Sequence, residues 1–447
     1  MLRFAFFSLL LVLMIGLLGC RLPGGGPSGT NILLISIDTL RPDHLGCYGY
    51  HRDTSPAIDS LAAAGVRWER CQAQSPWTLP SHATMWTGLS AAAHKTSWYD
   101  DAMHMVDPSL PTIATVLHDE GYRNIAFTNV WYLNGNYGFD IDFDHFDWHQ
   151  NGNGRAGITI EKVAKYLEDN IGNPRPFFMV IHLYDVHAPY APPQPYDTLF
   201  TNQGVGPDSV VWWDVTSEGI LRNRDQLDRF VGLYDGEIRW VDDQLAFLFS
   251  EMRRLDLDEN TVIFLTSDHG EEFLEHEGWG HGHTLYQELL HVPMIVSGPG
   301  VPSGVVDSTV VGLYDIFPTV TGLLGYQTPD NVEGSNMLDS LDLTERAVPA
   351  GAVSPDRYTL DKKGLQTLEP RDMAAVMIGA RKVIWDVLAD SMYMYRLDRD
   401  PSETEALEPD SVLAEAVMYY KATPPQCRPD PVVSDENKQM LEDLGYI

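Results

Sequence analysis

A carboxylate and an imidazole stand side by side, at Asp268 and His269, shortly after a short apolar segment. The segment, Val262 to Leu265, carries no charge, which is typical of a strand buried on both faces of a parallel sheet. Ligands gather at the carboxyl ends of strands in open α/β sheets, and an oxygen donor beside a nitrogen donor suits Zn or Mn. The pattern predicts a metal-binding edge, and the alternative is a strand end followed by a solvated polar loop. Further ionisable residues follow within the next fourteen positions, among them Glu271, Glu272, His276, His281 and His283.

Two other apolar segments are also followed by polar residues that could take part in chemistry. Asn31 to Ile37 is followed directly by Asp38, so a second buried strand is expected to place a second carboxylate at its C-terminal end. Phe177 to Leu183 is a third such strand and leads to His187. Taken alone, Asp38 is equally well explained as an acidic residue that ends a strand, and His187 as a turn residue.

Thr78 is expected at the start of a helix, as its N-cap, with Pro80 in the first turn where proline is tolerated. A hydroxyl at that position lies beside free backbone N–H groups and the positive end of the helix, which together attract an anion. The alternative is that Thr78 only caps the helix.

Taken together, these segments resemble the sulfatase family of the alkaline-phosphatase superfamily, over roughly residues 31 to 407. The resemblance implies an α/β fold with a mostly parallel central sheet flanked by helices and a smaller C-terminal antiparallel subdomain. It divides the chain into a catalytic domain at 31–350 and an antiparallel subdomain with its tail at 351–447. The principal matching blocks are SIDTLRPDHLGCYGY, PWTLPSHATMWTGL and TSDHGEEFLEHEGWGHGHTLYQELLHVPMIV.

The resemblance also implies roles for individual residues. It assigns one divalent metal to Asp38, Thr78, Asp268 and His269, with Thr78 as the nucleophile. His187 corresponds to a histidine that touches the transferred group or the leaving oxygen, and His281 stands where the family often has a lysine. At neutral pH, His281 replaces that lysine only if a neighbouring acid or the bound anion keeps it protonated. The residues expected to bind substrate are His82, Lys95, His187 and His281.

Two departures from the family pattern bear on the chemistry. Thr39 replaces a second aspartate, so the metal site loses a carboxylate, which favours Zn or Mn over Ca or Mg. Thr78 replaces the cysteine or serine that sulfatases oxidise to formylglycine, and the methyl group on its β-carbon prevents that oxidation. The expected function is therefore metal-dependent hydrolysis of an anionic ester through a covalent Thr78 intermediate, with phosphate mono- or diesters favoured and sulfate esters left open. The alternatives are a phosphoethanolamine-type transferase acting on a lipid or glycan, and a non-catalytic binding lipoprotein.

The charge of the chain narrows its partners. Its 447 residues include 63 acidic and 30 basic side chains, for a formal net charge of -33. Such a chain repels phosphate backbones, so no nucleic-acid partner is expected. An anionic ester substrate, whether a lipid, a glycan or a small molecule, needs a local positive centre, which a metal would supply.

The N-terminus indicates export. Residues 1–19 carry a single charge, Arg3, and an apolar run typical of a signal peptide. The run ends Leu17-Leu18-Gly19-Cys20, which resembles the bacterial lipobox and implies lipidation of Cys20. Residues 20–30 then form a flexible tether. We therefore expect an exported protein, held through its lipid anchor at the membrane of the bacterial cell envelope, on the periplasmic or outer surface. An uncleaved signal anchor is the alternative.

Overall fold

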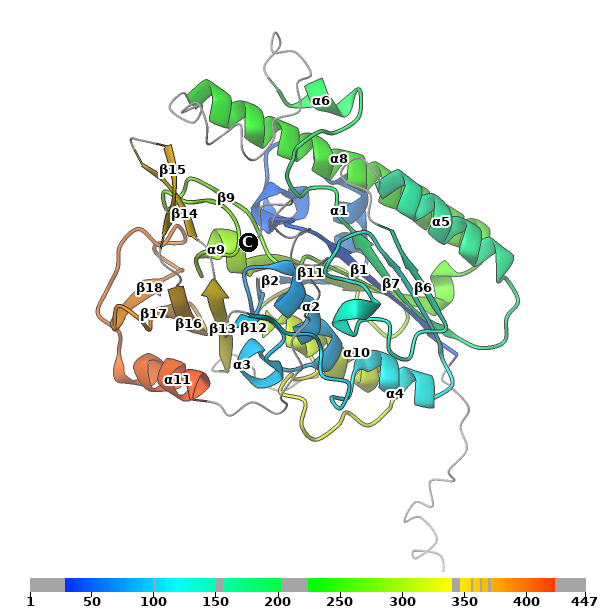
Figure 1. The fold of residues 1–447 in the computed structure, drawn as a ribbon. Coiled ribbons are helices and arrows are strands. Elements are labelled where there is room, and N and C mark those ends of the chain that lie inside the picture. Colours follow the sequence, from blue (N-terminus) through cyan, green and yellow to red (C-terminus); the bar gives the residue numbers. More distant parts are fainter. Residues whose placement is uncertain are drawn as a thin grey trace, which may run out of the picture.

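The computed structural model describes residues 29–99, 102–149, 156–201, 224–339, 346–354, 357–361, 364–368 and 371–422. The expected signal peptide and the lipidation site Cys20 lie outside these residues. Figure 1 shows a central sheet with helices on both faces and a second, smaller sheet beside it. Within the described ranges, no helix is both long and apolar enough to cross a bilayer.

Eight strands form the central sheet, in the spatial order β12-β2-β11-β8-β1-β7-β5-β6. Neighbouring strands are parallel except in the two pairs that involve β11. The predicted mostly parallel sheet is confirmed. In chain order the strands are β1 (Asn31–Ile37), β2 (Val66–Gln72), β5 (Arg123–Thr128), β6 (His145–Trp148), β7 (Phe177–Leu183), β8 (Thr261–Thr266), β11 (His291–Ser297) and β12 (Val305–Gly312).

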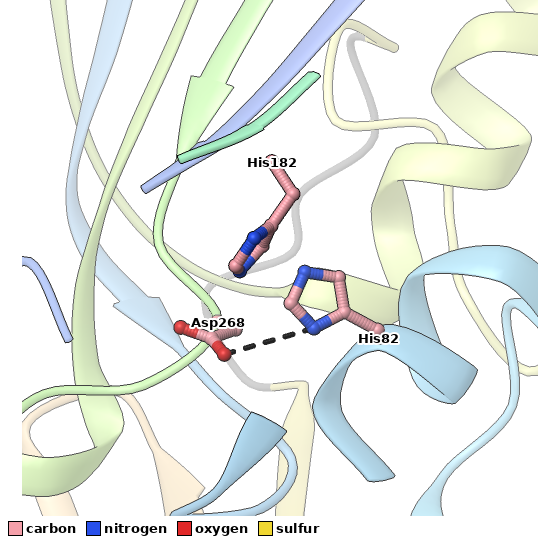
Figure 2. Close-up of side chains that lie close together, drawn as sticks. All are labelled: His82, His182 and Asp268. Carbon is pink, nitrogen blue, oxygen red and sulfur yellow. Dashed lines mark ion pairs between the residues drawn. The ribbon is translucent and has the colours of Figure 1, made fainter. Parts of the chain in front are cut away.

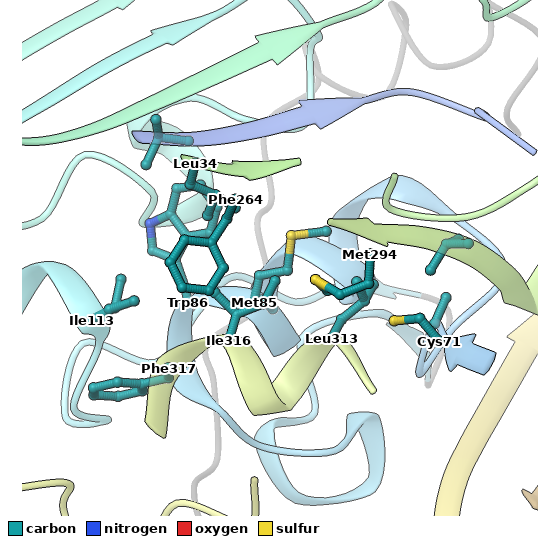
Figure 3. Packing of buried hydrophobic residues seen from close by; sticks show 14 of the residues in the cluster. Leu34, Cys71, Met85, Trp86, Ile113, Phe264, Met294, Leu313, Ile316 and Phe317 are labelled. Atoms are coloured by element: carbon teal, nitrogen blue, oxygen red, sulfur yellow. The ribbon is translucent and has the colours of Figure 1, made fainter. Parts of the chain in front are cut away.

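The strands β8, β1 and β7 are buried along their whole length because helices cover both faces of the sheet. Side chains of β1 alternate between two hydrophobic cores, with Leu34 in one and Leu33 and Ile35 in the other. Figure 3 shows the first core, in which Leu34 and Phe264 of the sheet pack with Trp86. Both faces of the central sheet are therefore covered, which leaves the strand ends as the place for a binding or catalytic site.

The longer helices pack into these two cores. The core with Leu33 is covered by α1 (Pro56–Ala63), α5 (Ala156–Asp169) and α8 (Arg224–Arg254). The core with Leu34 is covered by α2 (Thr78–Thr87), α4 (Ile113–Asp119) and α10 (Ile316–Leu324). The shorter helices include α3 (Ala91–His94), α6 (Tyr196–Leu199) and α9 (Gln287–Leu290).

The second sheet has the order β13-β16-β17-β18, all antiparallel, and α11 (Ser411–Lys421) packs against it. This confirms the predicted antiparallel subdomain, although the predicted division between residues 350 and 351 falls inside β13. The four strands are β13 (Ala347–Ser354), β16 (Arg371–Ile378), β17 (Arg381–Asp386) and β18 (Ser391–Arg396). Two-stranded ribbons are formed by β3 (Trp98–Tyr99) with β4 (Ala102–Met103), β9 (Glu272–Phe273) with β10 (Trp279–Gly280), and β14 (Arg357–Asp361) with β15 (Gly364–Leu368).

A buried ion pair ties the smaller sheet to the segment that follows β8. Lys382 Nζ on β17 lies 2.8 Å from Glu403 Oε1, and both side chains are buried. The other oxygen of Glu403 accepts the backbone N–H of Gln287 at 2.6 Å, at the start of α9. We call residues 270–286, which lead from the end of β8 to α9, the histidine loop. The smaller sheet thus anchors one end of that loop.

Candidate active site

The ends of β1 and β8 bring three predicted site residues together. The two strands are adjacent and parallel, with Ser36 opposite Thr266, so the residues that follow them meet at one edge of the sheet. Asp38, Asp268 and His269 are fully buried there, and one ligand atom from each lies within 4.8 Å of the others. His269 Nε2 is 3.7 Å from Asp38 Oδ1 and 3.4 Å from Asp268 Oδ2.

The hydrogen bonds around these residues leave three carboxylate oxygens without a partner among the described residues. Asp268 Oδ1 accepts the backbone N–H groups of Thr39 at 3.3 Å and His269 at 3.0 Å. The Nδ1–H of His269 donates to the carbonyl of Gly270 at 2.9 Å, which leaves Nε2 facing the carboxylates. Both oxygens of Asp38 and Oδ2 of Asp268 are buried without a hydrogen-bond partner among the described residues. Buried carboxylate oxygens need a partner, and a cation would provide it.

Thr78 reaches the same group from α2. The prediction that it is the N-cap was wrong by one position, because Trp77 is the N-cap and Thr78 is the first helical residue. Its hydroxyl does not cap the helix and instead lies 3.4 Å from His269 Nε2. The nucleophile predicted from the sequence is therefore beside the predicted metal ligands, at the positive end of a helix.

His82 lies one turn further along α2, fully buried behind Thr78. Its Nδ1 is 2.9 Å from the carbonyl oxygen of Thr78, and its Nε2 is 3.0 Å from Ser36 Oγ. It was expected to bind substrate, but with both ring nitrogens engaged by the protein its geometry supports a role in positioning Thr78. Its Nδ1 is also 3.6 Å from Asp268 Oδ2. Figure 2 marks this pair with a dashed line.

His182 is the buried site residue that the sequence reasoning missed. It is the penultimate residue of β7 and is fully buried, with Nδ1 3.0 Å from Asn129 Oδ1 and Nε2 3.4 Å from Asp38 Oδ2. His82, His182 and Asp268 each offer a ligand atom within 4.8 Å of the others (Figure 2). The available signal is a single histidine inside the otherwise apolar segment Phe177–Leu183.

His281 faces this group from the histidine loop. Its ring centroid is 4.4 Å from that of His269, and its Nδ1–H donates to Glu271 Oε1 at 2.8 Å. Glu271 is buried and also accepts the hydroxyl of Tyr190 at 2.8 Å. Burial raises the pKa of Glu271, but His281 and its other neighbours outweigh it and hold that pKa below its usual value. Glu271 is thus an acidic residue beside His281, and the role of His281 in substrate binding and catalysis stays a prediction.

His187 lies beside His281, with ring centroids 4.9 Å apart, and it stacks on Tyr184. Burial and the neighbouring His281 lower its pKa to about 4, so it is neutral at pH 7. The preceding residue, Val186, has a φ of 95°, which is strained for a β-branched side chain. Its N–H donates to Glu237 Oε2 at 2.9 Å, which helps to hold the strained turn that presents His187.

Lys95 is not among the side chains that the structure brings together here. It caps the C-terminus of α3, next to His94, whose ring contacts Thr84 Oγ1 at 3.1 Å. Thr84 is six residues along α2 from Thr78, or about 9 Å at the rise of an α-helix. Substrate binding by Lys95 stays a prediction.

The electrostatics of the buried group favour a cation. Burial and Asp268 raise the pKa of Asp38 well above its usual value, and burial also raises the pKa of Asp268. Burial lowers the pKa values of His182 and His269 well below the usual range. The histidines are therefore neutral, as metal ligands must be, and a divalent ion would hold both carboxylates ionised.

Comparison with known proteins identifies the family. A model of the sulfatase family matches residues 30–326. The ulvan-active sulfatase of Formosa agariphila is 25% identical over 354 residues, which cover 70% of this chain and 65% of that protein. The matched part of the chain thus spans slightly less than two thirds of that relative's length.

Solved structures share the fold. A protein solved with its substrate D-glucosamine-2-N,6-O-disulfate superposes with a TM-score of 0.69 at 18% identity, over 93% of this chain and 99% of the other. The phosphonate monoester hydrolase of Agrobacterium radiobacter gives 0.67 at 18% identity, over 94% and 96%. Because the family match extends over more than half of the chain, and the fold agrees, this chain belongs to the sulfatase family.

Proposed function

We propose that this chain is a metal-dependent hydrolase of anionic esters, with phosphate mono- or diesters as favoured substrates and Thr78 as the covalent nucleophile. The observation that carries the proposal is the position of the Thr78 hydroxyl, 3.4 Å from His269 Nε2 and beside two buried carboxylates. A threonine cannot become formylglycine, so release of sulfate by collapse of a hemiacetal is closed to it. Direct attack on phosphorus remains open.

The residues at the end of β1 and β8 fit a divalent cation. Three buried carboxylate oxygens of Asp38 and Asp268 have no hydrogen-bond partner among the described residues, and His269 directs Nε2 toward them. Asp38, Thr78, Asp268 and His269 would hold the ion, and this mixture of oxygen and nitrogen donors suits Zn or Mn. A cation bound there would lower the pKa of the Thr78 hydroxyl and neutralise the ester oxygens.

His281 is proposed to manage the proton of the leaving group. With Nδ1–H donating to Glu271, its Nε2 is the atom left to exchange a proton with substrate. The Thr78 hydroxyl gives its proton to solvent and its oxygen bonds to phosphorus, while the bond to the leaving alcohol breaks and that alcohol takes a proton from His281 Nε2. Water then attacks phosphorus and returns a proton to Nε2, and the Thr78 oxygen leaves and is reprotonated from solvent.

A glycan is the substrate class that the relatives support. One is named an ulvan-active sulfatase, and a solved structure holds D-glucosamine-2-N,6-O-disulfate as its substrate. The acidic chain offers little other positive charge for an anion, so the cation and His281 would supply most of the attraction. The lipobox-like segment ending at Cys20 supports a location at the cell envelope, where such polymers are met.

The test is covalent labelling of the full-length chain. The purified protein is analysed for metal and then soaked briefly in an aryl phosphate, a phosphodiester and an aryl sulfate, and its intact mass is measured. We expect bound Zn or Mn and a phosphoryl-sized adduct that Thr78→Ser retains and Thr78→Ala lacks.

Other results would overturn parts of the proposal. An adduct from the sulfate ester alone would assign the chain to sulfate chemistry. A phosphoryl group that passes to an added lipid or glycan, and not to water, would make the chain a transferase. If the purified protein contains no metal and forms no adduct, the reading that remains is a non-catalytic binding protein.

A further inference from the structure

Two buried β-branched residues beside the site have a left-handed backbone. Thr39, which follows Asp38 at the end of β1, has a φ of 55°, and Val186, which precedes His187, has a φ of 95°. A β-branched side chain disfavours this conformation, so the surroundings of each residue must hold it in place. Backbone strain of this kind gathers at functional sites, which directs attention to what holds these two residues.

The backbone of Thr39 is held at both of its polar groups. Its N–H donates to Asp268 Oδ1 at 3.3 Å, and its carbonyl oxygen accepts the hydroxyl of Tyr234, on α8, at 2.8 Å. The oxygen of Tyr234 in turn accepts the backbone N–H of Arg41 at 2.9 Å. These hydrogen bonds use the main chain of Thr39, so they remain available to any side chain at this position.

The hydroxyl of Thr39 connects the two strained residues. Its Oγ1 donates to the carbonyl oxygen of Val186 at 2.8 Å. The N–H of Val186 donates to Glu237 Oε2 at 2.9 Å, and the backbone N–H of His187 donates to the carbonyl of Tyr184 at 3.0 Å. Because Val186 is fully buried, loss of the Thr39 hydroxyl would take a partner from a buried carbonyl and free the turn to relax.

We infer that Thr39 is a positioning residue, whose hydroxyl fixes the turn at Val186 and thereby the ring of His187. The inference rests on the proposed function, because it gives Thr39 a role at the same site. The His187 ring lies 4.9 Å from that of His281, between centroids, so a shift of the turn disturbs the histidine proposed to exchange a proton with the leaving group. Thr39 thus ties the strand ends that carry the metal ligands to the rings that face the substrate.

The test compares Thr39→Val with Thr39→Ser in the full-length chain. Valine keeps the shape and the β-branch of threonine, so only the hydrogen bond to Val186 is lost, whereas serine keeps a hydroxyl. We expect kcat/KM for an alkyl phosphate to fall about 10- to 100-fold in Thr39→Val, with metal content unchanged, and to recover to within a few-fold in Thr39→Ser. The matched control is Thr54→Val, because Thr54 is equally buried and its hydroxyl also donates to a main-chain carbonyl, that of His44, at 2.6 Å. This variant should keep the wild-type kcat/KM.

A double-variant cycle separates positioning from a general loss of structure. If Thr39 acts through His187, Thr39→Val should cost little further activity in a His187→Gln background. Fully additive losses would overturn the inference, and so would wild-type kcat/KM in Thr39→Val or loss of its metal. Thr39→Ala is the second variant in case Thr39→Val does not fold. Without a β-branch, alanine tolerates the φ of 55° better, and it should show the same loss.

A spectroscopic measurement does not depend on turnover. The nuclear magnetic resonance signal of the His187 ring Cε1–H group is assigned by its absence in His187→Gln. We expect this signal to shift or broaden in Thr39→Val and to stay in place in Thr39→Ser and Thr54→Val. An unchanged signal in Thr39→Val would overturn the inference, whether or not the protein hydrolyses an ester. A shifted signal in a protein that forms no Thr78 adduct would reject the proposed function alone.

Discussion

Two of the regions in which histidines and carboxylates meet differ in the separation of these groups. In the histidine loop and α9, the closest nitrogen-to-oxygen distances are 2.6 to 2.8 Å. In the buried group at the strand ends they are 3.4 to 3.7 Å. The loop pairs are His276 with Glu288, His281 with Glu271, and His283 with Glu272.

The difference in distance reflects what lies between the atoms. At 2.6 to 2.8 Å a proton joins the two groups, so each pair is complete without a ligand. At 3.4 to 3.7 Å no hydrogen bond closes the gap, and the spacing suits two ligands of one cation. Residue types alone do not separate the two cases. Buried polar atoms without a hydrogen-bond partner among the described residues do separate them, and such atoms occur at Asp38, His182 and Asp268.

The largest effect is expected from replacing a carboxylate of the buried group at the strand ends. Asp268→Asn removes a carboxylate that faces both His269 and His82, so metal should be lost and turnover should fall by about four powers of ten. Turnover of an aryl phosphate and metal content, measured together, check this. Glu272→Gln, which alters a loop pair, is the control and should keep its metal. Equal metal content in both variants would contradict the distinction.

The next effect concerns how the histidine loop is held. Lys382→Met leaves Glu403 buried without its cation, which should lower the free energy of unfolding by about 3–5 kcal/mol. Urea denaturation followed by circular dichroism measures this. Adding Glu403→Gln should restore much of the loss, since the amide oxygen can still accept the N–H of Gln287. A double variant as unstable as the single one would show that the charge is not the cause.

A smaller effect is expected from the pair nearest to the metal ligands. Glu271→Gln should lower kcat about 100-fold, because Glu271 accepts the Nδ1–H of His281 and so fixes the orientation of its ring. The loss should be large for alkyl phosphates and small for 4-nitrophenyl phosphate, whose leaving group needs no acid. Tyr190→Phe removes only the other hydrogen bond to Glu271 and should cost a few-fold. An equal loss for both kinds of leaving group would exclude general-acid catalysis by His281.

The same contrast explains what could be predicted from the sequence. Asp38, Asp268 and His269 were found because each follows an apolar segment, and parallel strands must end at one edge of the sheet. Thr78 was placed one position out because helix ends are set by hydrogen bonds that residue types do not fix closely.

Two kinds of residue were beyond the sequence. His182 lies inside a strand, where a lone histidine is more often part of the core, and only its unmatched Nε2 distinguishes it. The pairing of Glu271 with His281 depends on the path of the histidine loop, which has no periodicity to reveal it. His82 was expected at the substrate, but the helical spacing of four residues places its ring against the Thr78 carbonyl.

The smallest effect concerns whether the protonated histidine of one loop pair stabilises the folded state. Burial lowers the pKa of His276, but its hydrogen bond to Glu288 outweighs burial and raises that pKa from 6.5 to about 9. The folded state therefore binds a proton that the unfolded state has lost, so the contribution is complete below pH 6.5 and disappears as the pH rises through about 9. The free energy of unfolding of the wild type should exceed that of His276→Gln by about 1 kcal/mol more at pH 6 than at pH 10. Stacking of His276 on Tyr286 is lost at every pH and cancels in this difference. Glu288→Gln should abolish the same pH dependence, and its persistence in that variant would show that another group carries the proton.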